Sequence, residues 1–565
     1  MSNEIIQSAY HSDPFEEEQK RGASQRIKNP LLIGCSGGGG HNSAILGLFH
    51  YFQTLVPSCT QLQKYDPLLP SNRTNSDLRD KITRGVNLMH SAYFGCPIKW
   101  FISSVTPFPI LPTQQEIKNE VSALTKTEPR VYIDILLDVY PAGYESAAIW
   151  NSLQKNDKVA ELKKLIHLQT MSDKENYFTV FTYFLKKLKL AAREGKPYTE
   201  LVSTQAMALP ALCDVVNYYN IWLKYKNVNA PKLIIHQYMT DLPTEGAQHF
   251  FNPLSQLNQM QQSQMKLYGV GMTNEILQKV IGTHHFSAVC DIPPKENPMA
   301  RPAFKEAAYD NSSSFSKTVT LDFQGMQSYT IEPNENIAAI MLGSQGSNDT
   351  SKYLAPLLQN NTNRVFVFGG TNELIKTDIA AIIKTHPEFK DRIIPLCNQD
   401  DKAISSLMTR CNTLIIRGGG LSVMEQMAMN HNNKQTVLIH HAEPTAGHEL
   451  TSGIPWEDAN VDALIHYLNN IQTVNTSSSS SSTKDGAIEN RRYLEENGIF
   501  CQKTSPERVR QQLEKIKLFQ EKNQPPQAEY KEINIPINNY FFTNNTSDKI
   551  SEGMHVLQEE PALVQ

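Results

Sequence analysis

The chain has 565 residues and a mass of 63.7 kDa, several times the size of a typical domain of about 150 residues, which predicts two large domains. Apolar residues make up 40% of it, and 53 basic against 57 acidic residues leave a net charge of −4, which does not favour a nucleic-acid partner. Its 8 cysteines include no C-x-x-C pair and no His/Cys cluster at metal spacing. This speaks against a disulfide framework or a structural zinc site and favours a reducing compartment.

Residues 1–28 are polar and acidic, and we expect them to form an N-terminal extension. They lack the basic start and the apolar core of a secretory signal. No run of 18 or more apolar residues occurs in the chain, whereas a membrane-spanning helix needs about 20. We therefore expect a cytoplasmic protein whose contact with a membrane is at most peripheral.

The first predicted unit is a strand, a glycine loop and a helix. Leu31, Leu32 and Ile33 form a short apolar run that stops at GCSGGGGH (34–41), and apolar residues then recur at helical spacing from Ile45 to Phe52. Similar short runs follow at 131–137, 201–202, 232–236, 266–270, 337–342, 364–368, 392–395, 413–416 and 436–440. Many are separated by segments long enough for a helix, which is typical of α/β folds with parallel sheets.

Two polar stretches divide the chain. Residues 291–330 are rich in Pro, Ser and Asn, and we interpret them as an interdomain connection with a small hairpin of 318–323 and 327–331. The serine run at 477–482 predicts a disordered surface loop at about 474–487. The predicted organisation is an extension (1–28), an N-terminal domain (29–290) with an insertion at about 50–130, the connection (291–330), a C-terminal domain (331–523) and a tail (524–565).

Three glycine-rich turns follow apolar runs, at 34–41, 342–347 and 417–422. Glycine lets backbone amides approach a ligand, and the N-terminus of a following helix favours negative charge, so the expected guest is a phosphate or pyrophosphate. Each loop could instead be only a tight turn from strand to helix. The spacing matches neither the phosphate loop of NTPases nor G-x-G-x-x-G, which disfavours those classes of nucleotide-binding protein.

The order of six segments resembles that of one enzyme family. The segments are GCSGGGGH (34–41), LVSTQAMALPAL (201–212), IIHQYMTDLPTEGAQHFF (234–251), IMLGSQGS (340–347), IIRGGGLSVMEQMAM (415–429) and NRRYLEENGIF (490–500). Together they resemble the GT-B glycosyltransferases related to the bacterial lipid II-forming N-acetylglucosaminyltransferase and to the monogalactosyl- and diglucosyl-diacylglycerol synthases. The resemblance implies an α/β, GT-B fold, in which two Rossmann-like domains, one for the acceptor and one for the nucleotide-sugar donor, face a cleft.

The resemblance also implies roles for individual residues. The diphosphate would be held by loop amides of Gly343, Ser344, Gln345 and Gly346, in a cleft also lined by Arg417, Gly418, Gly419, Gly420, Leu421 and Ser422. Glu425, on the following helix, would accept the ribose hydroxyls; the alternative is a solvated surface glutamate. The donor sugar would be recognised by Glu443, His448 and Glu449, and the acceptor-side loop would be formed by Gly37, Gly38, Gly39 and Gly40.

Catalysis needs a base for the acceptor hydroxyl, and His41 at the mouth of the first loop is the best candidate. Imidazole titrates near neutral pH, whereas a carboxylate would need a raised pKa. Asp241 resembles a strand-end aspartate of the family and would assist or orient the acceptor. Either residue could instead cap a helix. Loop amides and a helix dipole would neutralise the diphosphate, so we expect neither a metal nor a cofactor.

The leading hypothesis is an inverting, metal-independent glycosyltransferase that moves a sugar from a UDP-sugar to an acceptor hydroxyl. The acceptor is open; a lipid is one candidate, and the aromatic segments 93–94, 100–102 and 108–110 could bind it. A nucleotide-sugar 2-epimerase and a catalytically silent GT-B scaffold are the alternatives. The polar composition and the tail, with Glu559 and Glu560 near an apolar end, resemble bacterial proteins delivered into host cells by type IV secretion.

Overall fold

The computed structural model describes residues 29–36, 40–55, 112–125, 130–140, 143–156, 158, 161–162, 165, 174, 176–282, 286, 288–306, 317–333, 335–344, 346–360, 362–369, 372–397, 399–429, 435–441, 454–476 and 501–522. The predicted extension, the serine run and the tail lie outside these residues, as does most of the predicted insertion. Of the predicted site residues, those outside are Gly37, Gly38, Gly39, Gln345, Glu443, His448 and Glu449.

The first structural unit is built on a six-stranded parallel sheet with the order β2-β1-β3-β4-β5-β6. Its strands are β1 (Pro30–Gly34), β2 (Ile133–Asp134), β3 (Glu200–Ser203), β4 (Ile234–Tyr238), β5 (Met265–Val270) and β6 (Val289–Ile292). The helices around it are α2 (Gly40–Leu55), α5 (Gln114–Thr125), α6 (Gly143–Lys155), α8 (Tyr177–Arg193), α9 (Leu209–Tyr225), η4 (Glu245–Ala247), α10 (Gln248–Ser255), α11 (Gln259–Gln262) and α12 (Asn274–Ile281). Helical crossovers are what parallel strands require.

The first strand and helix lie where the apolar pattern predicts them. All five residues of β1 are buried. The buried residues of α2 include Ala44, Ile45, Leu48 and Phe52, which recur along one helix face. Gly47 lies on that helix where a Cβ atom would come within 2.4 Å of the Met299 carbonyl oxygen. Glycine therefore lets α2 pack directly against the connection between the two units.

One predicted strand is wrong in most of its length. The apolar run at 131–137 forms only the two residues of β2 and then continues as a π-helix, η3 (Ile135–Val139). The cause is Asp134, whose Oδ1 accepts hydrogen bonds of 3.1 Å from two successive backbone amides of η3. A side chain that satisfies backbone amides locally competes with the ladder of a sheet.

The second unit is also a six-stranded parallel sheet, with the order β11-β10-β9-β12-β13-β14. Its strands are β9 (Ile337–Met341), β10 (Arg364–Phe368), β11 (Ile393–Leu396), β12 (Thr413–Ile416), β13 (Thr436–His440) and β14 (Cys501–Thr504). Its helices are η6 (Asn348–Tyr353), α14 (Leu354–Gln359), α15 (Glu373–Thr385), η7 (Pro387–Phe389), α16 (Asp401–Arg410), α17 (Gly420–Ala428), α18 (Pro455–Thr476) and α20 (Val509–Lys522). Numbered within the unit, this is the Rossmann order 3-2-1-4-5-6.

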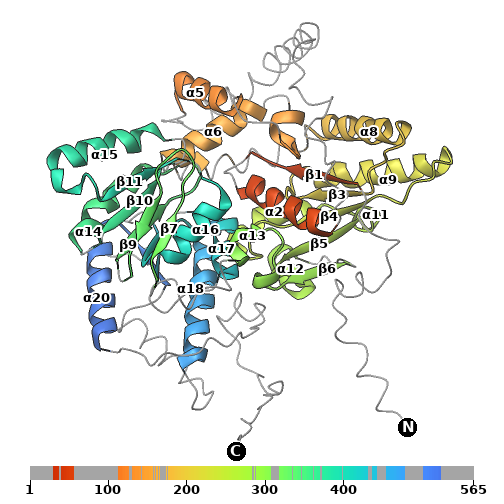
Figure 1. The fold of residues 1–565 in the computed structure, drawn as a ribbon. Helices are drawn as coiled ribbons and strands as arrows, with labels where there is room; N and C mark the ends of the chain where they lie inside the picture. The colour runs from red at the N-terminus through yellow and green to blue at the C-terminus, as the bar shows by residue number, and fades with distance from the viewer. Residues whose placement is uncertain are drawn as a thin grey trace, which may run out of the picture.

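In the sequence between the two sheets, the chain forms η5 (Pro294–Glu296), α13 (Pro302–Glu306) and a hairpin of β7 (Val319–Leu321) and β8 (Tyr329–Ile331). The antiparallel pairing of β7 with β8 confirms the predicted hairpin. Figure 1 shows the two units side by side, with α13 and α17 between the sheets. Two parallel sheets of this kind confirm the predicted α/β class with two Rossmann-like units.

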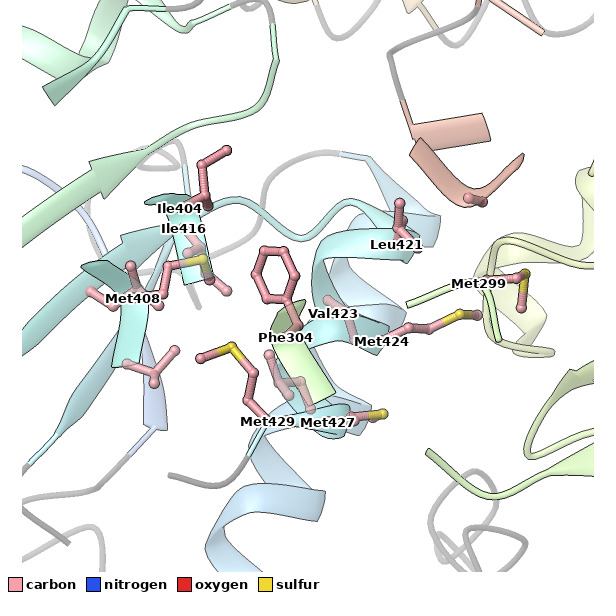
Figure 2. Packing of buried hydrophobic residues seen from close by; sticks show 14 of the residues in the cluster. Met299, Phe304, Ile404, Met408, Ile416, Leu421, Val423, Met424, Met427 and Met429 are labelled. Atoms are coloured by element: carbon pink, nitrogen blue, oxygen red, sulfur yellow. The ribbon is translucent and has the colours of Figure 1, made fainter. Parts of the chain in front are cut away.

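One hydrophobic cluster extends through both units. It contains Leu32 and Tyr238 from the first sheet, and Ala339 and Leu414 from the second. Figure 2 shows Phe304 of α13 among side chains that include Ile404, Met408, Ile416, Val423, Met427 and Met429. Methionine is flexible enough to fill an irregular gap of this kind. The connection is therefore a packed part of the core.

Candidate active site

The strand order of the first sheet reverses beside β1: β2 lies on one side of β1, and β3 lies on the other. In open α/β sheets, ligands bind outside the carboxyl ends of the strands at such a point. His41, the second residue of α2, follows β1, and Thr204 follows β3. The Nδ1 atom of His41 lies 2.9 Å from the Thr204 carbonyl oxygen. The predicted base therefore stands at the point where this fold binds ligands.

The surroundings of His41 select one tautomer. A carbonyl oxygen only accepts hydrogen bonds, so Nδ1 carries the proton and Nε2 carries the lone pair. The Nε2 atom makes no hydrogen bond with any residue that the structure describes. Burial lowers the pKa of His41, against the opposing effects of the Thr204 hydrogen bond and of Asp134. The ring is therefore neutral near pH 7 and can accept a proton at Nε2.

Thr240 connects His41 with the second predicted catalytic residue. Its Oγ1 lies 3.2 Å from Nδ1 of His41 and donates to Oδ2 of Asp241 at 3.4 Å. The pKa of Asp241 is raised to about 6: burial raises it most, Glu457 raises it further, and hydrogen bonds from Asn460 and Thr240 oppose these effects. The three side chains form a polar relay, His41–Thr240–Asp241. In this relay His41 and Asp241 bind other side chains, and neither acts as the cap of a neighbouring helix.

His41, Thr240 and Asp241 all line one cavity of about 130 Å³. The other lining residues are Lys174, Tyr177, Val180, Thr204, Gln205, Ala206, Met207, Ala208, Pro210, Ala211, Met239, His249, Phe250, Asn252, Pro253 and Gln256. All of them belong to the first unit, and most are apolar or uncharged. The cavity thus offers an apolar volume with a neutral imidazole and a carboxyl group on its wall.

The third glycine loop brings the second unit to this wall. A Cβ atom on Gly420 would lie 2.3 Å from the Thr240 carbonyl oxygen and 2.5 Å from Oδ1 of Asp241. A Cβ atom on Gly418 would lie 2.5 Å from Val461 of α18. Gly419 has no such neighbour within 4 Å. Other parts of the protein therefore pack directly against Gly418 and Gly420. Of these three glycines, only Gly419 faces open space.

Of the other two predicted residues of the third loop, Leu421 is buried and Ser422 is exposed.

The second glycine loop is more open. Gly343 has a φ of +86°, which only glycine adopts readily, and a Cβ atom there would meet nothing within 4 Å. Gly343 and Ser344 are both exposed. Gly346 has a φ of +71° and approaches the Gly369 carbonyl oxygen, 2.2 Å from where a Cβ atom would lie. This loop offers Gly343 and Ser344 to a ligand.

Two charged residues of the predicted donor site are paired within the protein. The Nε atom of Arg417 lies 2.9 Å from Oε2 of Glu457. Glu425 is only 4% exposed, so it is not the solvated glutamate of the alternative hypothesis. Arg301 donates to Oε1 of Glu425 through Nε at 2.7 Å and to Oε2 through Nη2 at 3.0 Å. Burial and the pairing of both oxygens with Arg301 leave Glu425 little surface for a ligand in this arrangement.

Sequence reasoning missed Thr204, Thr240, Asn460 and Arg301. Thr204 and Thr240 lie inside segments that carry the family resemblance, LVSTQ and YMTD, but a threonine beside a strand end has many other uses. Asn460 and Arg301 had no local signal, because Asn460 lies 219 residues from Asp241 and Arg301 lies 124 residues from Glu425 in the chain. They can be found only from the tertiary structure.

Among the residues that the structure describes, no helix has the length and apolarity to cross a bilayer. The same residues contain no group of three or more His, Cys, Asp or Glu side chains placed to hold a metal ion.

Comparison with known proteins gives similarity at the level of structure. No protein-family model and no curated protein sequence matches the chain. Arabidopsis thaliana UGT89C1, complexed with UDP-L-rhamnose, is 11% identical with a TM-score of 0.33, over 74% of this chain and 80% of that one. Acinetobacter baumannii MurG is 11% identical with a TM-score of 0.26, over 61% and 79% of the two chains. Anabaena HepE, in complex with UDP-glucose, is 10% identical with a TM-score of 0.26, over 58% and 80%.

Proposed function

We propose that the protein is an inverting, metal-independent glycosyltransferase that moves a sugar from a UDP-sugar to an acceptor hydroxyl. One observation carries this proposal. His41, with Nε2 free of described partners, stands on a cavity wall and is linked through Thr240 to Asp241, which touches the third glycine loop of the other unit. A base for the acceptor and a loop for the donor therefore meet at one place.

The proposed transfer would use this arrangement as follows. The acceptor hydroxyl gives its proton to Nε2 of His41 while its oxygen forms a bond to the anomeric carbon of the sugar. The bond from that carbon to the diphosphate oxygen breaks on the opposite face, and UDP leaves with the electron pair. Nδ1 of the new imidazolium donates to the Thr204 carbonyl oxygen and also lies 3.2 Å from the Thr240 hydroxyl, which donates to Asp241. The negative charge of Asp241 would therefore lie close to the new positive charge.

The donor would lie along the second unit. The exposed Gly343 and Ser344 would give backbone amides to the diphosphate, and oriented amides need no metal. The amide of Gly346 already donates to the Gly343 carbonyl oxygen at 3.2 Å, so Gly346 would shape the loop, and the role of Gln345, which lies outside the described residues, stays a prediction. Gly419 would approach the same group, because it faces open space in the third loop. Glu425 would accept the ribose hydroxyls, and for this the ribose would have to share the carboxylate with Arg301. Sugar recognition by Glu443, His448 and Glu449 stays a prediction, since these residues lie outside the described part of the chain.

The acceptor would be an amphiphilic alcohol, and a lipid is the candidate that the surface of the first unit supports. Phe178, Tyr218, Ile221 and Tyr225 of α8 and α9 are 50–77% exposed. The Lys189 ammonium lies 4.9 Å from the centre of the Tyr218 ring. Exposed aromatic residues among lysines favour peripheral contact with an anionic membrane. Because α8 also contributes Tyr177 and Val180 to the cavity wall, a bound lipid would lie beside His41.

The first test combines thermal shift with a hydrolysis and transfer screen over UDP-, GDP- and ADP-sugars. A UDP-sugar at 100 times its Kd should stabilise the protein by about 2.7 kcal/mol. Binding without any transfer or hydrolysis would favour the silent scaffold, and conversion of the donor sugar without an acceptor would favour the epimerase. No shift with any nucleoside diphosphate at millimolar concentration would refute the donor site.

His41→Ala separates chemistry from donor binding. Loss of the base should lower turnover by about 10²- to 10⁴-fold and leave UDP affinity unchanged, because the donor is assigned to the other unit. Since burial lowers the pKa of His41, the wild-type rate should persist below pH 6.5 before it falls with protonation of the ring. A variant with normal turnover but a lower Tm would reduce His41 to a packing residue.

Cytoplasmic location, peripheral membrane contact and delivery to a host cell are the further parts of the proposal. The tail on which delivery rests lies outside the described residues. Co-flotation with vesicles containing anionic lipid tests the membrane contact. Binding that is lost when Phe178 and Tyr218 are changed to Ser would support the α8 and α9 surface, and equal binding of both proteins would contradict it.

A further inference from the structure

A buried amide links the acceptor side of the proposed site with its donor side. Asn460 belongs to α18 and is 0% exposed. Its Nδ2 atom donates to Oδ1 of Asp241 at 3.3 Å and to the carbonyl oxygen of Gly418 at 3.3 Å. One side chain of the second unit thus holds both the carboxyl group on the cavity wall and the third glycine loop.

The orientation of this amide is determined by its neighbours. Asp241 and the Gly418 carbonyl both accept, so Nδ2 must face them. The Oδ1 atom of Asn460 is then buried and has no hydrogen-bond partner among the described residues. An unpaired buried oxygen costs about 1–3 kcal/mol. Packing alone does not explain a polar side chain held at such a cost, because an apolar residue of the same shape would avoid it.

The titratable groups around Asp241 come from three elements. His41 on α2 reaches it through Thr240, Glu457 on α18 acts on it as a like charge, and Arg417 after β12 is paired with Glu457. Burial and Glu457 disfavour the carboxylate, whereas the hydrogen bonds from Asn460 and Thr240 favour it. Loss of the Asn460 amide would therefore raise the pKa of Asp241 further.

We propose that Asn460 is a positioning residue: it holds Oδ1 of Asp241 against the third glycine loop, so that Oδ2 faces Thr240 and, through it, His41. The inference rests on the proposed transfer reaction, in which this relay supports the base. Asn460 touches no reacting atom and acts through Asp241. It also makes the geometry of the base depend on the presence of the donor loop, since the same Nδ2 atom binds both.

The test is Asn460→Leu in the full chain, with Asn220→Leu as its matched control. Asn220 is a structural asparagine of the first unit, which donates to the Leu233 carbonyl oxygen at 2.9 Å and accepts from the Leu233 amide at 2.8 Å. Both changes remove a similar amide, and both should lower the Tm. Asn460→Leu alone should reduce turnover, by about ten- to a hundredfold for a hydrogen bond to a charged group. The part of the pH–rate profile that reports ionisation of Asp241, which must be charged to support the imidazolium, should move to higher pH.

A second measurement works without any substrate. Below pH 6 Asp241 is protonated in both proteins, and above it the variant ionises less readily, so the destabilisation caused by Asn460→Leu should grow as the pH rises from 5 to 8. In an Asp241→Asn background this growth should vanish. If Asn460→Leu does not fold, Asn460→Ala, which leaves space for water, serves in the same two measurements.

The outcomes separate this inference from the proposed function. A destabilisation that is equal at every pH, with turnover and its pH profile unchanged, would overturn the positioning role. A wild-type protein that binds no UDP and transfers no sugar would refute the proposed function, and the catalytic part of this inference with it. In that case the stability measurement still decides whether Asn460 controls the ionisation of Asp241.

Discussion

The second and third glycine loops follow strands of the same sheet, yet their glycines face different things. In the second loop, Gly343 has a left-handed backbone and faces open space. In the third loop, Gly418 and Gly420 lie against Val461 and Asp241, so close that no Cβ atom would fit. A glycine-rich turn can therefore leave room for a ligand or for another part of the protein. Its sequence does not tell these two uses apart.

The largest expected effect is that of Gly420→Ala. Its Cβ atom would overlap a backbone oxygen and the Asp241 carboxyl group, so the N-terminus of α17 must move away from β4. Overpacking of this kind costs about 1–3 kcal/mol, and we expect the upper end because backbone yields least. Thermal unfolding measures it. An unchanged Tm would mean that the third loop is not packed against the first unit.

Asp241→Asn tests how the charge of Asp241, which lies against the third loop, affects the pH dependence of stability. The pKa of Asp241 is raised from 3.8 to about 6, so between these values the folded protein binds more protons than the unfolded chain. Stability from this group is therefore greatest at low pH and falls as the pH rises through that window. Relative to Asp241→Asn, the wild type should lose about 2–3 kcal/mol between pH 4 and pH 7. Parallel stability curves for the two proteins would contradict the raised pKa.

Gly343→Ala tests the open loop. The backbone φ of +86° is unfavourable for alanine, and the expected loss of stability is about 1–2 kcal/mol. Because no atom lies near the new Cβ, the fold should remain intact. The same methyl group would stand where the diphosphate is proposed, so UDP affinity measured by calorimetry should fall. Unchanged affinity would place the diphosphate elsewhere.

Gly419→Ala should have the smallest effect on stability. This glycine has an ordinary φ of −63° and no neighbour within 4 Å of a Cβ atom. Alanine is a poorer helix N-cap than glycine, so the expected cost is about 0.5–1 kcal/mol. A loss of UDP binding with only this small change in Tm would show that the third loop also serves a ligand, at its one open position. Retained binding would assign that loop to packing alone.

The fold could be predicted from sequence to a large extent, because the information is local. The apolar runs at 337–342 and 413–416, for example, contain β9 and β12, and a glycine loop follows each. Where prediction failed, a single side chain changed the outcome: Asp134 ends β2 after two residues by binding two amides. The spacing of apolar residues contains no information about such a hydrogen bond.

The site was less accessible to sequence reasoning. His41 and Asp241 could be chosen because they stand at strand ends, but their link through Thr240 joins residues 199 positions apart. Glu425 could be chosen as a carboxylate on α17, but its pairing with Arg301 spans 124 positions. Such contacts depend on how the two units pack together. A local sequence pattern therefore identifies candidate functional residues. It does not identify the distant residues that set their orientation and pKa.

The hydrophobic cluster that extends through both units has a consequence for how the protein unfolds. Leu32 and Leu414 belong to different sheets, and Phe304 of the connection lies in the same cluster. Each unit also has a buried cluster of its own, but the shared cluster couples the two units, because the loss of one sheet would expose apolar side chains of the other. Heating should give a single cooperative transition, with equal calorimetric and van't Hoff enthalpies.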